Sequence, residues 1–300
     1  MARVFALSDL HVDFADNMQQ MMSLSDHEYT DDVLLVAGDV SDRISRLSQL
    51  LGSLKRKFRK VAFVPGNHEL WLRDDDSDNS LEKFSRLLAL CEQLGVHTEP
   101  FKVGQNDRAV WIVPLYSWYR TEDADEYSLV IPKEGERWEK CLWMDKYRCR
   151  WPESLGADAY GPADYFLALN NEKIERRYDA PIISFSHFLP RKELIFEDSA
   201  MVKRFCEKDA FIPRSTRDPA PMFNFTRVAG CKRLDLQIRA LGATVHVYGH
   251  QHRHRNRKID GITYVSNCLG YAREREHLGA QVAPKLLWED GVFVEPAEVS

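Results

Sequence analysis

The sequence predicts an α/β fold built on a parallel sheet, and two observations support this prediction. In the first third of the chain, short β-branched or aliphatic runs alternate with segments that repeat apolar residues at helical spacing. Five short polar motifs then follow aliphatic runs directly along the chain. The carboxyl ends of strands are where open α/β sheets bind their ligands, so these motifs are expected to lie together.

The first elements form a βαβαβ pattern. Strands are expected at residues 4–7, 33–37 and 61–64, each a run of Val, Leu, Ala or Phe. A Met-rich stretch around residues 18–24 separates the first two strands. A helix is expected at 44–58, where leucines recur at helical spacing. Because a helix connects consecutive strands, the sheet should be parallel.

The later elements are less regular. A helix is expected at 81–94, with Gly95 just past its end, and a strand at 109–113. From about 115 to 180 the chain is rich in aromatic residues without a clean period, which predicts an insertion that packs on itself and on the main body. The remaining expected elements are strands at 182–185, 244–248, 261–267 and 285–289, the last two antiparallel in character, and a helix at 231–241.

The composition predicts a single domain that spans residues 1–300, and it excludes few functions. The 300 residues carry a formal net charge of -5, which gives no global attraction to nucleic acid or anionic membrane. No run is long enough to span a bilayer, and the first apolar run is too short for a signal peptide. The six cysteines form no Cys-x-x-Cys pair and are expected to be reduced. We therefore expect a cytoplasmic protein, with its oligomeric state open.

The polar motifs are weak signals one by one and a strong signal together. Asp39 alone could cap a helix, Asn67 could be a turn residue, and His187 could be a buried structural histidine. As an ordered set, the motifs supply carboxylates, an amide and imidazoles, the mixture that holds two transition metal ions side by side. The five motifs are Asp9-Leu10-His11, Gly38-Asp39, Gly66-Asn67-His68-Glu69, His187 and Gly249-His250-Gln251-His252.

This ordered set resembles the calcineurin-like metallophosphoesterase superfamily, whose pattern is D-x-H, G-D, G-N-H-[DE], H and G-H-x-H. The resemblance implies a two-sheet β-sandwich core flanked by helices. It also implies that one metal ion is held by Asp9, His11 and His252, and the other by Asn67, His187 and His250, with Asp39 bridging them. Glu69 is expected to orient its neighbours.

The resemblance further implies a mechanism. A hydroxide that bridges the two metal ions attacks phosphorus, and His68, which is not a ligand, protonates the leaving oxygen or stabilises the transition state. The donor mixture suits manganese, iron or zinc. Asp42 stands where purple acid phosphatases carry a ligating tyrosine, which argues against an iron–tyrosinate centre.

We therefore expect a binuclear metal-dependent phosphoester hydrolase, of the phosphomonoesterase type. One alternative is a phosphodiesterase that acts on cyclic nucleotides, nucleotide-linked compounds or short nucleic acid, and another is a non-catalytic interaction module on the same fold. The substrate is a small-molecule or macromolecular phosphoester.

The substrate-binding residues are not identified by the sequence. The stretch Trp118-Tyr119-Arg120 could cover the metal pocket, although a packed structural cap is favoured. The basic run at 253–258 invites a nucleic-acid interpretation, which the acidic net charge and the lack of interleaved aromatic residues make unlikely. Cations that follow His187 could bind a polyanion, although a solvated face is favoured: Arg191, Lys192, Lys203, Arg204, Arg214 and Arg217.

Overall fold

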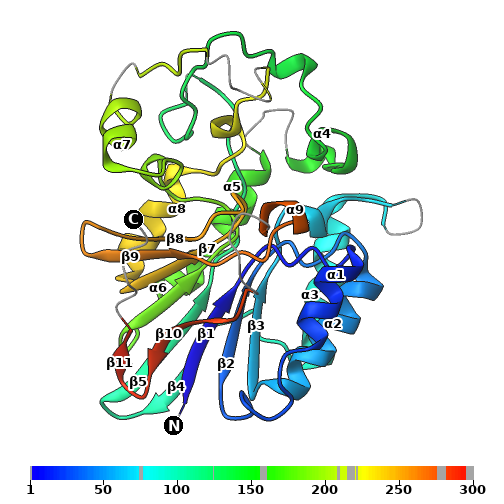
Figure 1. Cartoon of the computed structure of the whole chain (residues 1–300), viewed down its shortest axis with the longest axis vertical. Coiled ribbons are helices and arrows are strands. Elements are labelled where there is room, and N and C mark those ends of the chain that lie inside the picture. The colour runs from blue at the N-terminus through cyan, green and yellow to red at the C-terminus, as the bar shows by residue number, and fades with distance from the viewer. Residues whose placement is uncertain are drawn as a thin grey trace.

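Two mixed β-sheets pack face to face in the computed structural model of the chain (Figure 1). The structure describes residues 2–294 except 74–76, 124, 156–160, 208–209, 215–219, 221 and 276–281. The first sheet has the order β11-β10-β1-β2-β3 and consists of β1 (Arg3–Leu7), β2 (Val33–Ala37), β3 (Lys60–Val64), β10 (Lys285–Glu289) and β11 (Val292–Phe293). The second has the order β4-β5-β6-β7-β9-β8 and consists of β4 (Phe101–Gln105), β5 (Arg108–Pro114), β6 (Ile182–Phe185), β7 (Val245–Tyr248), β8 (Arg255–Ile259) and β9 (Ile262–Ser266).

The strand sequences explain why the sheets form a sandwich. In β2, Val33 and Leu35 face the apolar layer between the two sheets, whereas Leu34 and Val36 pack against the layer of helices. Both faces of the strand are therefore buried, which is why it reads as a continuous apolar run. The first sheet is covered by α1 (Ala15–Met22), α2 (Ile44–Lys57) and α3 (Ser80–Leu94), and α6 (Asn171–Glu175) and α8 (Lys232–Leu241) pack together beside the second sheet (Figure 1).

An upper layer of mostly irregular chain lies over the carboxyl ends of the strands (Figure 1). The expected insertion at 115–180 supplies part of it, including α4 (Asp145–Arg148) and α5 (Gly161–Ala168). The chain after β6 supplies the rest, including α7 (Ser199–Phe205). Isolated β-bridges between Lys133 and Ile212 and between Ser128 and Cys231 join the two segments.

The βαβαβ start and the two-sheet α/β fold are confirmed. The antiparallel character expected of the last two strands is confirmed for 285–289, which pairs with β1. It holds only in part for 261–267, which is antiparallel to β8 but parallel to β7. The sequence did not reveal β8, because it lies in the basic run 253–258 and at the edge of its sheet, where no apolar alternation is required.

A buried histidine in β7 has no access to water. His246 is fully buried between Ser184 and Ser186, whose Oγ atoms lie 2.8 Å from Nδ1 and 3.0 Å from Nε2. Ser186 donates its own proton to the carbonyl oxygen of Phe188, so it accepts from Nε2–H, and in the neutral ring Nδ1 accepts from Ser184. Burial accordingly lowers the pKa of His246 to about 3.

Replacing His246 with Gln should flatten the dependence of the unfolding free energy on pH. Between pH 3 and about 6.5, the unfolded chain binds more protons at this position than the folded chain, so stability is complete above that range and is lost as the pH falls. Urea unfolding of metal-stripped protein at pH 7 and pH 5 measures the effect. The wild type should lose up to about 1.4 kcal/mol per pH unit more than the variant. The exposed His27→Gln control should keep the wild-type slope, and equal slopes in all three proteins would contradict the assignment.

Candidate metal centre

The strand ends bring all the expected ligand residues into one cluster. Asp9 and His11 follow β1, Asp39 follows β2, and Asn67 and His68 follow β3, all in the first sheet. The second sheet contributes the three remaining imidazoles, from His187 after β6 and from His250 and His252 after β7. The cluster therefore straddles the seam between the two sheets.

The backbone at these positions is held in an unusual conformation. Five of the eight described non-glycine residues with positive φ belong to the cluster: Asp9, His11, Asp39, His250 and His252, with φ between 42° and 72°. Asp, Asn and His tolerate this left-handed region better than other residues, yet it still costs free energy. The concentration of such residues at one place is typical of a functional site.

The loops after β2 and β3 both donate backbone hydrogen bonds to one buried carboxylate. Glu69 accepts hydrogen bonds from the backbone N–H groups of Asp39 (2.9 Å), Val40 (2.6 Å), Ser41 (2.9 Å) and Gly66 (2.7 Å). Burial and the neighbouring Asp39 charge raise the pKa of Glu69 to about 7, while the amide donors oppose this rise. Gly66 also lies so close that a Cβ atom on it would be 2.3 Å from Asp39 Oδ1.

One set of donor atoms gathers around Asp9. Single ligand atoms of Asp9, His11, Asp39 and His252 all lie within 4.8 Å of one another. His252 Nε2 is 3.6 Å from Asp9 Oδ1 and 2.8 Å from His11 Nε2. The backbone N–H of His250 donates to Asp9 Oδ1 over 2.8 Å, which fixes the carboxylate.

A second set shares Asp39 with the first. Ligand atoms of Asp39, His187 and His250 also lie within 4.8 Å of one another. His187 Nε2 is 3.4 Å from Asp39 Oδ2 and 3.2 Å from the amide oxygen of Asn67. Asp39 is thus the residue common to both sets, as a bridging ligand must be.

Each imidazole of the second set uses one ring nitrogen in a hydrogen bond to a backbone carbonyl, which directs its other ring nitrogen toward the candidate metal position. His187 Nδ1–H donates to the carbonyl oxygen of Ala37 (2.9 Å), and His250 Nε2–H donates to that of Val228 (3.0 Å). A carbonyl can only accept, so in the neutral rings His187 Nε2 and His250 Nδ1 carry lone pairs, and these face each other at 3.2 Å. Two facing lone pairs repel unless a proton or a metal ion lies between them. Burial lowers the pKa of His187, but the neighbouring Asp39 carboxylate raises it to about 9, so a proton occupies this position when no metal ion is bound, and a metal ion would take its place. This donor set therefore fits a bound metal ion.

The same arrangement recurs in the first set. His252 Nδ1 lies 2.8 Å from the carboxylate of Glu274, which leaves Nε2 directed at His11 Nε2. Burial lowers the pKa of His11 and of His250 well below the usual range, so both rings are neutral, as ligation requires. Sequence reasoning missed Glu274, because it lies 22 residues from His252 and belongs to none of the five motifs.

His68 lies beside both sets with its ring partly open. Its Nε2 is 3.8 Å from Asp39 Oδ2, and its side chain is 16% exposed, against 3% for that of Asp39. The imidazole stacks on Trp71, with ring centroids 3.7 Å apart, and meets His11 edge-on at 4.6 Å. This leaves His68 held in place at the edge of the cluster and accessible from the cavity.

A cavity of about 340 Å³ opens over the cluster. Its floor includes Asp39, Asn67 and His68. Its apolar wall comes from both segments of the upper layer: Leu142, Trp143, Met144, Phe223 and Phe225. The proposed cap residues Trp118, Tyr119 and Arg120 are buried and are not among the described residues that line the cavity. Trp118 packs on Phe188, and Arg120 pairs with Asp125.

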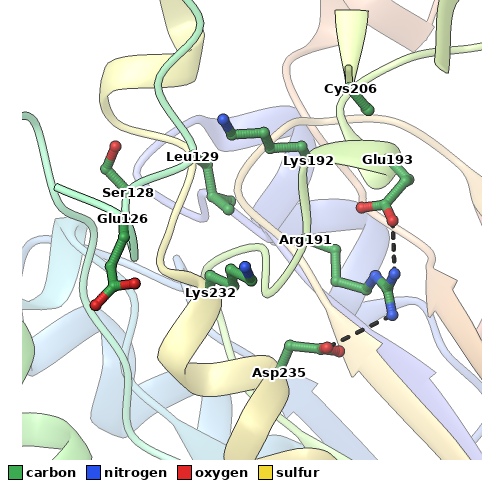
Figure 2. Close-up of a pocket in the computed structure, with 9 residues that line it drawn as sticks. All are labelled: Glu126, Ser128, Leu129, Arg191, Lys192, Glu193, Cys206, Lys232 and Asp235. Atoms are coloured by element: carbon green, nitrogen blue, oxygen red, sulfur yellow. Dashed lines mark hydrogen bonds and ion pairs between the residues drawn. The ribbon is translucent and has the colours of Figure 1, made fainter. Parts of the chain in front are cut away.

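The cations that follow His187 belong to a different part of the surface. Figure 2 shows Arg191 beside Glu193 and Asp235 in a cavity of about 240 Å³, none of whose lining residues also line the cavity over the cluster. The Arg191 guanidinium also pairs with Asp260 at 3.0 Å, so its charge is neutralised by its own neighbours. Lys203 and Arg204 lie on α7, and Arg217 lies outside the described residues.

Comparison with known proteins identifies the family. Residues 2–254 match the model of the calcineurin-like phosphoesterase family. The chain is similar to the [acyl-carrier-protein] phosphodiesterase PptH of Mycobacterium tuberculosis, with 28% identity over 286 residues that cover 90% of this chain and 78% of that protein. It also resembles the crystal structure of phosphopantetheinyl hydrolase (PptH) from the same organism, with a TM-score of 0.71, 23% identity and 99% of each chain covered.

The chain therefore belongs to the calcineurin-like phosphoesterases. It is a metal-dependent phosphoester hydrolase, and its donor residues are arranged to hold divalent metal ions. Among the described residues, no helix combines the length and the apolar character needed to cross a bilayer.

Replacing Glu69 with Gln should destabilise the site without removing a ligand. One carboxylate oxygen would become an NH₂ group that faces backbone N–H donors, and a buried donor left without a partner costs about 1–3 kcal/mol. Urea unfolding in the presence of a chelator should show this loss of free energy. The exposed Glu92→Gln change on α3 is the matched control and should stay within about 0.5 kcal/mol of the wild type. Equal stability of the two variants would contradict the role of Glu69.

Proposed function

We propose that this chain is a binuclear phosphodiesterase whose two metal ions share Asp39. Asp9, His11 and His252 hold one ion, and Asn67, His187 and His250 hold the other. The observation that supports this assignment most directly is the convergence of two sets of donor atoms that share Asp39, with the atoms of each set within 4.8 Å of one another. The mixture of imidazole and carboxylate donors favours manganese, iron or zinc.

The residues around the two ions have different roles in the proposed reaction. Bound metal ions supply Lewis acidity, which neutralises phosphate charge and makes water nucleophilic near neutral pH. Glu274 and the Ala37 and Val228 carbonyls keep His252, His187 and His250 oriented with a lone pair toward the ions. His68 donates a proton from the cavity side to the leaving oxygen.

The substrate we propose is a phosphodiester with an organic arm. Phosphodiester hydrolysis is the alternative rather than the first interpretation of the sequence, and a carrier protein was not among the substrates that the sequence suggested. The relative of 28% identity is a phosphodiesterase that is named for acyl carrier protein. The wall of the cavity in this chain is compatible with the arm, because its apolar residues would contact an organic group on the phosphate. The preference for a diester rests on the relative. A further cavity of about 490 Å³ shares Leu142, Trp143 and Phe223 with this wall and extends the apolar surface. A carrier protein with a phosphopantetheine arm is therefore the substrate to test.

Metal analysis separates the shared ligand from an unshared one. Asp39→Asn should lower the content of both ions, because it removes the anion common to the two sets, whereas Asp9→Asn should mainly lower one. Elemental analysis after loading with manganese, iron or zinc measures this, with the exposed Asp16→Asn as control. Loss of both ions in Asp9→Asn, or of neither in Asp39→Asn, would count against the assignment.

Activity assays test the class of substrate and the role of His68. The metal-loaded protein should release the arm from phosphopantetheinylated carrier protein, detected by mass spectrometry, and should hydrolyse bis-aryl phosphate faster than aryl monophosphate. A preference for the monoester would restore the first interpretation of the sequence. No turnover of any of the three would favour a non-catalytic module.

His68→Ala should keep both ions and lose about 10²–10⁴-fold in rate on substrates with an alkyl leaving group. An aryl leaving group needs little protonation, so its rate should fall much less. The exposed His27→Ala change is the control and should behave as the wild type. If His68→Ala slows both classes equally, His68 stabilises transition-state charge instead, and if it loses an ion, His68 is a ligand.

A further inference from the structure

The upper layer places one buried carboxylate directly behind the cluster. Asp145, the first residue of α4, is 3% exposed. It accepts hydrogen bonds from Asn67 Nδ2 (2.9 Å), Trp71 Nε1 (2.6 Å) and Trp143 Nε1 (2.9 Å), and it also bonds to the Tyr119 hydroxyl. These neutral donors surround both oxygens of Asp145 and hold the carboxylate in one orientation.

The bond to Asn67 decides which end of its amide faces the metal position. An amide group has an acceptor end and a donor end of nearly equal size. Because Nδ2 donates to Asp145, Oδ1 is turned to the other side, where it lies 3.2 Å from His187 Nε2. Rotating the amide by 180° would direct an NH₂ group at the cation position and leave the amide oxygen against the Asp145 carboxylate. Both changes are unfavourable.

The hydrogen bond from Trp71 to Asp145 also affects His68, the proposed general acid. Trp71 donates to the same oxygen of Asp145 as Asn67 does, and its indole stacks on the imidazole of His68. A single carboxylate from α4 thus contacts two neighbours of the cavity floor, one a proposed ligand and the other the platform for His68.

We propose that Asp145 is a positioning residue, which orients the Asn67 amide for metal binding and fixes Trp71 beneath His68. The proposal rests on the proposed function, because it assigns Asn67 as a ligand. It means that the insertion completes the metal centre in addition to covering it. Hydrogen-bond partners that orient ligands are typically worth about 10–100-fold in metal affinity.

Manganese binding to metal-stripped protein tests this role without any substrate. Asp145→Leu keeps approximately the size of the side chain but offers no hydrogen-bond acceptor, so the Asn67 amide and the Trp71 indole both lose their anchor. Calorimetric titration with Mn²⁺ alone should show one of the two sites weakened about 10–100-fold, with the Asp9 site little changed. If the variant only damaged the fold, both sites would lose manganese affinity.

A matched control and a rescue complete the experiment. Asp125→Leu changes another aspartate of the same insertion, whose side chain is 6% exposed and pairs with Arg120 at 2.9 Å, and it should leave both manganese sites intact. The double variant Asn67→Asp with Asp145→Asn reverses the pair, so that the new amide donates to the new carboxylate. It should bind manganese at this site more tightly than Asn67→Asp alone, in which two carboxylates face each other.

Three outcomes would overturn the proposal. Asp145→Leu could bind two manganese ions as tightly as the wild type, or Asp125→Leu could lose the same affinity, which would make the effect a general one on the insertion. In these two cases the wild-type metal content and activity stand, so the proposed function survives. A wild type that binds no manganese, iron or zinc would overturn the proposed function and this role together.

Discussion

The geometry of the centre depends on a carboxylate that is not expected to touch a metal ion. Glu69 ties the loop after β2 to the loop after β3 through four backbone N–H groups. Without it those donors would be buried and unpaired, and Asp39 and Asn67 would no longer be held at a fixed separation. Burying an acid is costly, and four amide donors offset that cost only while both loops keep their shape. The free energy of the fold and the geometry of the site are therefore set by the same contacts.

The cluster is organised before any ion arrives. The left-handed backbone at Asp9, Asp39 and His252, and the carbonyl oxygens that accept from His187 and His250, fix the directions of the donor atoms at the expense of backbone strain. A metal ion therefore binds to donors that are already ordered, and it displaces the proton that the raised pKa of His187 keeps on that ring.

The sequence predicted the cluster and much of the fold because both have local signals. Each ligand motif follows its own aliphatic strand, and the strand order is set by the βαβ rule. The contacts made by Asp145, Glu274 and Phe223 have no such signal, because each residue lies outside the five motifs and far from the partners that it contacts. Arg191 shows the converse: a cation close to a motif in sequence is directed to Asp260 by tertiary structure. The edge strand β8 was missed for want of apolar alternation.

The position of the cluster on the seam between the sheets has a consequence for how the chain folds. Asp9, Asp39 and Asn67 come from one sheet and His187 and His250 from the other, and otherwise the sheets are held together mainly by an apolar layer. An ion bound there would link the two sheets through its ligands. Any ligand that binds only the folded state adds RT ln(1 + [L]/Kd) to its stability. Metal supply would then set the stability of the folded enzyme as well as its turnover, and the metal-free protein would be folded but less stable than the metal-loaded form.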